Sequence, residues 1–571
     1  MSAVPTSAAV PLFASPGELC VPSRETHPLA ESAIEELELI TPQVSDSVSI
    51  SDTILDGCSK GCREYWARDT RHFYSSRRFL QDTQALLRTY TVQPDLDWDR
   101  FDSWAVDSEG HLNNETFETQ YQYIDLERAK WVNHYPLVGQ ALVLSNYTAP
   151  ITNLLLPFIS VLIVLLLKYA RTGDLCVQDA KTALWETIGK RLLGALSAPT
   201  LPAKVYAAAI TGMYFVNVYA NARSCIRFRE SFREIRQYLA DSTILIDSAR
   251  VECQKLIEAS TRLKTYGPFV NQLEEGGRAL DECRLLLSDT SVAWQGGKSG
   301  QEFTTFYRLL KEPALIATCA WARSLLAYTE VLTTLQVHLA NGRLAACSFS
   351  KRNTAFSGLR HPAMLWSSSG EAVENAVDVA KSIVLTGPNA SGKTTLVKAV
   401  MINALMCQQW GLGTFKKAKV LPVVGFHCYM NVPDSTARDS LFQAEARRCK
   451  EVLDILATTP GSHLCLFDEL YSGTNPVEAA GATAAYLSFV SENYPSSRFL
   501  LTTHLTSVCE ELEECAVAVK MGGQSTSTSF TPSYRSSKGV SRERTGYLVL
   551  RDLGYPDGII EKLNTFAAQE Y

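Results

Sequence analysis

A glycine-rich stretch in the last third of the chain has the residue spacing of a phosphate-binding loop. Residues 382–395 read SIVLTGPNASGKTT and contain the pattern GxxxxGK[ST]. Gly387 and Gly392 allow backbone angles that let successive N–H groups wrap a phosphate. We expect Lys393 to reach the β- and γ-phosphates and the Thr394 hydroxyl to ligate Mg²⁺. The residues predicted to bind ATP here are Gly387, Pro388, Asn389, Ala390, Ser391, Gly392, Lys393, Thr394 and Thr395.

Three polar side chains follow two later apolar stretches that have the character of buried strands. HLCLFDE (463–469) ends in Asp468 and Glu469, and RFLLTTH (498–504) ends in His504. The carboxyl ends of parallel strands meet at the edge of the sheet that carries the phosphate loop. We therefore expect Asp468 to hold Mg²⁺ together with Thr394, usually through water. Glu469 is then the candidate base for the attacking water, and His504 a second candidate catalytic residue beside the γ-phosphate.

The elements that must position these residues are those of an α/β nucleotide-binding domain with a mostly parallel sheet. A short apolar strand precedes the loop, and a helix of roughly 394–407 follows it. Asn475 and Pro476 have the residue types of a helix N-cap and first turn, and this helix should run to about residue 490. Ser440 opens another helix, through about residue 456, and a serine at a helix N-terminus is a cap and an anion site.

Length and composition limit the class of protein. A chain of 571 residues is too long for one core, so about three or four domains are expected. An apolar content of 46% excludes wholesale disorder, and a net charge of −6 argues against a globally basic nucleic-acid binder without excluding a local basic surface. The 15 cysteines include no CxxC pair, and Cys58 and Cys62 form a single CxxxC. We interpret them as free thiols in a reducing compartment, nucleus or cytoplasm, in preference to a zinc site.

The first 134 residues carry no recognisable chemistry. Residues 1–50 are rich in Ser, Ala, Pro and Val, which predicts a mobile N-terminal arm. Residues 51–134 are helical or mixed. Within them, 60–92 interleaves arginines with Tyr65, Trp66, Phe73 and Tyr74, which is typical of an amphipathic helix and also of a phosphate-contacting surface. We favour the amphipathic helix.

Two uncharged runs dominate residues 135–223. No Asp, Glu, Lys or Arg lies between His134 and Lys168, where 151–167 is nearly all apolar, and a second uncharged run covers 205–222. Two such runs predict either a membrane hairpin or a pair of core helices in a helical domain. We lean toward membrane association. Burial of the two runs in the folded chain would distinguish the alternatives.

The next region, residues 224–350, has almost uninterrupted helical periodicity, with apolar residues three and four apart and charges between them. Long helices of this kind predict a lever or clamp. The nucleotide domain then occupies residues 351–571.

Five motifs of that domain occur in a characteristic order. They are RHP at 360–362, TGPNASGKTT at 386–395, SLFQAE at 440–445, FDELYSGTNP at 467–476 and TTH at 502–504. Together they resemble the ATPase domain of the MutS family, the DNA mismatch-repair proteins and their relatives. The tail from 530 to 563 is similar to the family's C-terminal strand pair and following helix, and this end of the domain is where the family's dimerisation helices lie.

The resemblance implies a homo- or heterodimer with two composite sites for ATP and Mg²⁺. In the family, the serine that matches Ser440 reaches across the interface to the partner's γ-phosphate. ATP binding would close the ATPase domains and switch a clamp on duplex, mismatched or branched DNA, in mismatch repair or related repair and recombination. The chain departs from the family in several respects: it is far shorter than the full mismatch-repair members, and Asn475 stands where a Ser or Thr is common in them. Its N-terminal part shows no recognisable mismatch-reading domain, and the apolar hairpin has no place in the standard repair protein. The alternative is a membrane-attached MutS-like ATPase that acts on a protein partner or on membrane-associated DNA.

Overall fold

The computed structural model describes residues 25–43, 48–92, 96–174, 176–189, 200–288, 299–366, 372–430, 441–525, 530–543, 550–551, 553–556 and 558–563. These residues form two compact units. The helical unit holds the described residues of Asp97–Arg250 and Gly276–Arg323. The sheet unit holds those of Leu19–Leu96, Val251–Glu275 and Ser324–Tyr571.

The sheet unit is organised around a six-stranded sheet with the order β10-β11-β12-β7-β13-β14. In chain order the strands are β7 (Ser382–Thr386), β10 (Gly425–Tyr429), β11 (His463–Asp468), β12 (Arg498–Thr503), β13 (Ala516–Ser525) and β14 (Phe530–Lys538). The first five in the sheet order are parallel, and β14 is antiparallel to β13. Every residue of β7 is buried, as expected for a central strand of a parallel sheet. The predicted α/β fold with a mostly parallel sheet is confirmed.

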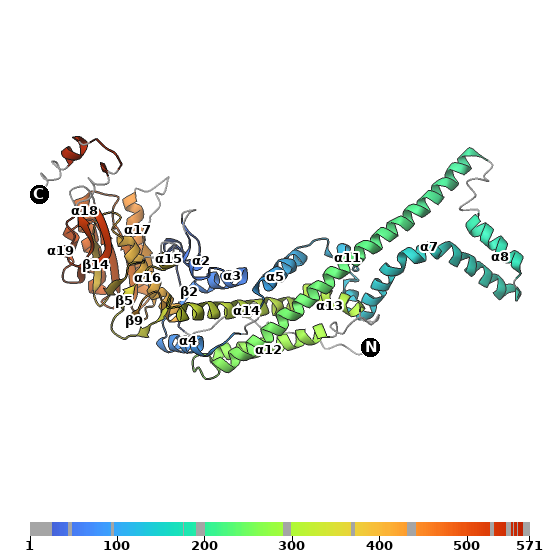
Figure 1. The fold of residues 1–571 in the computed structure, drawn as a ribbon, viewed down its shortest axis with the longest axis horizontal. Coiled ribbons are helices and arrows are strands. Elements are labelled where there is room, and N and C mark those ends of the chain that lie inside the picture. The colour runs from blue at the N-terminus through green and yellow to red at the C-terminus, as the bar shows by residue number, and fades with distance from the viewer. Residues whose placement is uncertain are drawn as a thin grey trace. The chain divides into compact units, whose positions relative to one another are not determined.

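Helices cover this sheet, as the orange and red ribbons of Figure 1 show. They are α16 (Lys393–Trp410), α17 (Leu441–Thr458), α18 (Pro476–Asn493) and α19 (Ser507–Glu511), while the short helix α15 (Pro362–Trp366) contacts α2 instead. Residues of α17, α18 and α19 share one apolar core with β10, β11 and β12, in which Phe467 and Leu487 are almost fully buried. Asn475 caps α18 as predicted, its side chain accepting a hydrogen bond from Val477 N at 2.9 Å.

Smaller sheets complete the unit. Four strands pair in the order β4-β9-β5-β6, with bounds Ser348–Phe349, Lys417–Val420, Ala355–Leu359 and Asn375–Asp378. Two-stranded sheets join β3 (Ala345–Ala346) to β8 (Leu412–Gly413), and β1 (Thr26–Pro28) to β2 (His72–Tyr74).

The N-terminal segment belongs to the sheet unit. Besides β1 and β2, it contains α1 (Glu31–Glu36), α2 (Ile50–Ile54), α3 (Lys60–Asp69) and α4 (Arg77–Thr89). Ile34 and Leu37 are almost fully buried, and the Glu36 carboxylate accepts a hydrogen bond from Met430 N at 3.0 Å and pairs with Arg448. The prediction of a mobile arm over residues 1–50 is therefore wrong for 25–43, because apolar and charged contacts with distant residues hold them. Residues 1–24 lie outside the described part of the chain.

Buried glutamines join this segment to the helix that follows the phosphate loop. Gln408 Nε2 donates to Tyr74 O at 3.0 Å, and Gln409 Nε2 donates to His72 O at 3.0 Å. In the opposite direction, Gln84 Nε2 donates to Gly411 O at 2.7 Å. Buried carbonyls need donors, and these side chains supply them where no strand does. The C-terminal end of α16 is thus fixed by residues from the first ninety of the chain.

The helical unit is built on long helices and an aromatic core. Its elements are α5 (Trp98–Leu112), α6 (Phe117–Tyr121), η1 (Lys130–His134), α7 (Pro136–Thr172), α8 (Val177–Leu184), η2 (Trp185–Gly189) and α13 (Ser299–Lys311). Three further helices, α11 (Leu201–Ser260), α12 (Gly267–Ser288) and α14 (Pro313–Ala340), contribute residues to both units. Tyr123 stacks on Phe303 at 4.0 Å between ring centroids. A Cβ built on Gly139 would lie 2.7 Å from Gly300 O, so these two glycines let α7 and α13 approach closely.

The two apolar runs lie on α7 and on the first part of α11, and both are exposed. Phe158 and Leu162 on α7 are 55% and 56% exposed, and Val216 on α11 is 67% exposed. By length and composition, α7 qualifies as a membrane-spanning helix, and only 6% of its most apolar window is buried. Tyr214 OH donates to Leu154 O at 3.0 Å, so the two runs are in contact. Core helices would be buried, so the exposure of both runs contradicts the core-helix alternative.

Candidate nucleotide site

The phosphate loop connects β7 to α16 with the glycines where the backbone requires them. Gly392 has φ +90° and is the N-cap of α16, and a Cβ there would lie 3.1 Å from the ring of Tyr534. Ala390 also has a left-handed φ of 58°. The Ser391 hydroxyl is buried and has no hydrogen-bond partner among the described residues. A tight loop at a helix N-terminus with an unsatisfied buried hydroxyl fits a bound phosphate.

Lys393 lies within this loop. Its Nζ donates to Gly387 O at 3.0 Å and to Pro388 O at 3.2 Å, and the residue is only 6% exposed. Burial lowers the pKa of the Lys393 ammonium, and the nearby carboxylates of Asp468 and Glu469 oppose that shift. The ammonium group is therefore held at the loop by carbonyl oxygens that a phosphate can replace.

The two predicted metal ligands are hydrogen-bonded to each other. Thr394 Oγ1 donates to Asp468 Oδ2 at 3.0 Å, although the residues are 74 positions apart. The Thr502 hydroxyl donates to the other carboxylate oxygen of Asp468 and orients it. A hydroxyl and a carboxylate beside a phosphate site are the hard oxygen donors that Mg²⁺ prefers. These donors fit the metal that the sequence predicts.

The candidate base and the histidine meet at the ends of β11 and β12. Glu469 Oε1 lies 3.0 Å from His504 Nε2, and Lys393 Nζ lies 3.0 Å from the same nitrogen. One ring nitrogen cannot serve both neighbours at once: protonated, it donates to Glu469, and unprotonated, it accepts from Lys393. The hydrogen bond with His504 holds the pKa of the Glu469 carboxyl below its usual range, with the charge of Lys393 contributing. Glu469 is thus ionised at neutral pH, as a proton acceptor must be.

Glu469 has a backbone conformation that is unusual for a residue with a side chain. Its φ is +53°, and its N–H donates to Thr502 O at 3.1 Å. The loop that follows is held by Glu445 of α17, which accepts hydrogen bonds from Ser472 N at 3.1 Å and Gly473 N at 3.2 Å. Sequence reasoning assigned Glu445 no role. The sequence marked Glu445 only as part of the motif SLFQAE. Its contact with the loop could not be predicted, because the two are far apart in the sequence.

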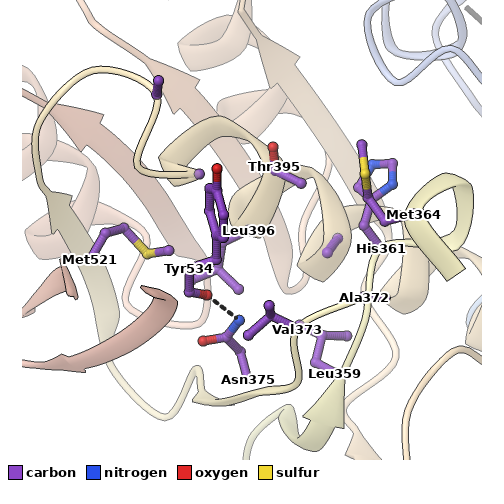
Figure 2. A pocket seen from close by; sticks show the side chains of 13 residues that line it. Leu359, His361, Met364, Ala372, Val373, Asn375, Thr395, Leu396, Met521 and Tyr534 are labelled. Carbon is purple, nitrogen blue, oxygen red and sulfur yellow. Dashed lines mark hydrogen bonds between the residues drawn. The ribbon is translucent and has the colours of Figure 1, made fainter. Parts of the chain in front are cut away.

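A pocket of about 410 Å³ borders the loop, and sequence reasoning did not identify it. Figure 2 shows Met521 and Tyr534 on one side of it and His361 and Met364 on the other, with Thr395 of α16 above. Asn375 Nδ2 donates to Tyr534 O at 3.0 Å and so joins β6 to β14 at the pocket. Burial lowers the pKa of His361 to about 4, which leaves its ring neutral at pH 7. A largely apolar pocket beside a phosphate loop is suited to a nucleoside.

The structure brings together most of the residues that the sequence singled out. Residues 387–395 form the loop and the first turn of α16, and Asp468, Glu469 and His504 come to it from neighbouring strands. Ser440 lies outside the described residues, so its predicted role across a dimer interface stays a prediction.

Strand order, glycine loop and strand-end acids together define an ATPase domain of the phosphate-loop class. Residues 383–569 match the protein family described as MutS domain V. This part of the chain is therefore the ATPase domain of the MutS family, and the predicted resemblance is confirmed for it.

Several known proteins match the chain over parts of their length. The chain is 24% identical over 319 residues to the putative endonuclease MutS2 of Bacillus subtilis, which covers 54% of the chain and 39% of that protein. It is 27% identical over 344 residues to the endonuclease MutS2 of Streptococcus uberis, covering 60% of the chain and 40% of that protein. The match to the endonuclease MutS2 of Halalkalibacterium halodurans is 30% over 186 residues, 32% of the chain and 23% of that protein. The matches thus span less than half of each relative.

Proposed function

We propose that this protein is an ATP-driven switch of the MutS type that binds DNA as a dimer. The observation that carries the proposal is the convergence of Lys393, Asp468 and Glu469 on a phosphate loop within a MutS domain V. In this proposal, ATP hydrolysis drives a conformational change of the protein. The mismatch-repair or recombination role of the switch rests on the family resemblance.

The residues of the site divide the work of hydrolysis among them. The loop N–H groups and Lys393 hold the phosphates, and the apolar pocket beside the loop takes the nucleoside. Thr394 and Asp468 would hold Mg²⁺, which when bound neutralises charge on the β- and γ-phosphates. Glu469 accepts a proton from water, and His504 orients that carboxylate and contacts Lys393.

DNA is the proposed ligand because of the names of the proteins that this chain resembles. Relatives that match the chain are named endonuclease MutS2, and the name endonuclease supports a nucleic-acid ligand. The dimer is proposed from the family, in which Ser440 would complete the partner's site. Either a homodimer or a heterodimer satisfies this arrangement.

The test is the ATPase rate of the purified full chain with and without homoduplex, mismatched and branched DNA. Salt must be fixed and stated, because phosphate contacts weaken steeply as salt rises. Lys393→Ala serves as the control for contaminating ATPases. A rate that changes with one DNA structure supports the switch and identifies its ligand. A rate indifferent to every DNA, together with no DNA binding in a mobility-shift assay, would refute the DNA part of the proposal.

A second candidate function, attachment to a membrane, is favoured by the exposed apolar hairpin. The runs of 17 and 18 residues on α7 and α11 are about 26 and 27 Å long at 1.5 Å per residue, close to the hydrocarbon thickness of about 30 Å. Exposed apolar surface on this scale is unfavourable in water. A bilayer would remove it, and the hydrogen bond from Tyr214 to Leu154 O would hold the two runs together.

Basic residues flank the second run where lipid headgroups would lie. Arg223, Arg227 and Arg229 follow it on α11 and are all exposed. Arginines at the end of a spanning segment interact favourably with anionic headgroups.

Flotation with vesicles of neutral and anionic phospholipid tests this candidate. The full chain should float with the vesicles and resist extraction at high salt, because apolar insertion is insensitive to screening. Leu162→Lys with Leu166→Lys should abolish flotation, since both side chains are 56% exposed on α7. Val106→Lys is the matched control, because Val106 is 58% exposed on α5, outside the apolar runs. A full chain that stays soluble without detergent and does not float would exclude attachment.

A further inference from the structure

Two cysteines at the start of α3 and a glutamate of α14 form a cluster outside the nucleotide site. One sulfur from Cys58, one from Cys62 and a carboxylate oxygen of Glu330 all lie within 4.8 Å of one another. Cys62 is fully buried, Glu330 is 5% exposed, and Cys58 is partly exposed. The cluster is thus mostly buried with one side open to solvent.

The local structure fixes the three ligands from two directions. Ser59 is the N-cap of α3, and its hydroxyl accepts a hydrogen bond from Cys62 N at 3.1 Å and donates to Glu330. Ser59 N also donates to Glu330 Oε1 at 2.9 Å. One turn further along α14, Thr334 Oγ1 lies 3.2 Å from Cys58 Sγ. Each carboxylate oxygen carries two lone pairs, so a carboxylate can accept hydrogen bonds and bind a metal ion at the same time.

The position of Cys62 suits a metal-bound thiolate. Cys62 is in the first turn of α3, where the partial positive charge of the helix N-terminus stabilises an anion. Two thiolates and a carboxylate in one buried space repel one another unless a cation lies between them.

We propose that Cys58, Cys62 and Glu330 bind one Zn²⁺ ion that cross-links the start of α3 to α14. Sulfur and carboxylate oxygen are ligands that zinc accepts together, and zinc takes four of them in a tetrahedron. Two sulfurs bound to tetrahedral zinc at about 2.3 Å each lie about 3.8 Å from each other. Small side-chain rotations would bring the two cysteine sulfurs to this separation. Water on the open side of Cys58 supplies the fourth ligand.

The test is the metal content of the full chain, purified under reducing conditions and measured by mass spectrometry. One zinc per chain is expected, and Cys58→Ser and Cys62→Ser should each lose it. Glu330→Gln should weaken retention against a chelator at least tenfold. Cys515→Ser is the matched control, because Cys515 is also a partly exposed free cysteine of the sheet unit but lies outside the cluster. Its zinc content should equal that of the unchanged chain.

A second measurement on the unchanged chain keeps the proposal testable if a variant fails to fold. X-ray absorption at the zinc edge should count two sulfurs and lighter ligands, and Co²⁺ in place of zinc should give thiolate-to-cobalt charge-transfer absorption. Absence of metal from reduced protein, metal with no sulfur ligand, or an intact Cys58–Cys62 disulfide in its place would each overturn the proposal. ATP hydrolysis is measured separately, so the two proposals fail independently.

Discussion

Replacing Glu469 by glutamine tests the central assignment of the site. The change keeps the shape of the side chain and its contact with His504, 3.0 Å away, but removes the charge that accepts a proton. A positioned general base contributes about 10²- to 10⁴-fold to a rate, or roughly 3–5 kcal/mol. We therefore expect Glu469→Gln to lower kcat by about 10²- to 10⁴-fold. ATP affinity should change little, because the loop and Lys393 hold the phosphates.

The assay measures binding and chemistry separately. A fluorescent ATP analogue reports affinity, and single-turnover hydrolysis reports the chemical step. Glu478→Gln is the control: it is the same substitution at an exposed glutamate of α18 that bonds Thr474 Oγ1 at 2.8 Å. Because the pKa of Glu469 is lowered, the unchanged enzyme should keep its rate below neutral pH and lose it only as pH falls through that pKa. The variant should lack this fall.

Two results would refute the reasoning. A variant that binds ATP and hydrolyses it within about threefold of the unchanged rate cannot have lost its base, given the size of the effect. A variant that loses affinity and rate in equal measure would assign Glu469 to nucleotide binding instead.

Three further substitutions have defined outcomes. Asp468→Asn should raise the Mg²⁺ concentration needed for half-maximal ATPase rate about 10- to 100-fold, as expected for a residue that holds the metal through water; an unchanged Mg²⁺ titration would remove it from the metal site. Glu445→Ala removes the charged acceptor of two partly buried N–H groups in the loop after β11, and it should destabilise the domain by about 1.5–3 kcal/mol in thermal unfolding. An unshifted transition would contradict that role. Gly392→Ala should weaken nucleotide binding, because φ +90° strains a side chain by about 1–2 kcal/mol, whereas Gly481→Ala, with open space around it, should bind nucleotide normally.

The sequence predicted those parts of the site that local rules determine. A strand that breaks into GxxxxGK[ST], and strands that end in Asp468, Glu469 and His504, place their side chains at one sheet edge by topology alone. Asn475 and Pro476 started α18 where capping rules put them. These predictions needed no knowledge of distant partners.

Contacts between distant residues could not be predicted in this way. Trp66 belongs to the arginine-rich stretch of residues 60–92, yet it is buried and stacks on Trp410 at 5.6 Å between ring centroids. The CxxxC of Cys58 and Cys62 has no second pair in sequence, and its third neighbour, Glu330, comes from another helix. Composition likewise cannot separate a buried helix from a membrane-facing one. Exposure shows that α7 is not buried within the described part of the chain, and exposure depends on the whole fold.

The glutamine contacts of α16 also determine when the N-terminal segment can complete its packing during translation. Gln84 and its acceptor Gly411 are 327 residues apart. At about 5–20 residues per second, a ribosome needs roughly 16–65 s to make the chain between them. Phe79 and Tyr65 of the N-terminal segment contact Tyr266 and Tyr328, which are made earlier, but the residues that contact α16 lack these partners throughout the interval. The nascent chain should therefore depend on chaperones. A fragment that begins at residue 383 should aggregate, because it lacks the contacts that residues 25–90 make.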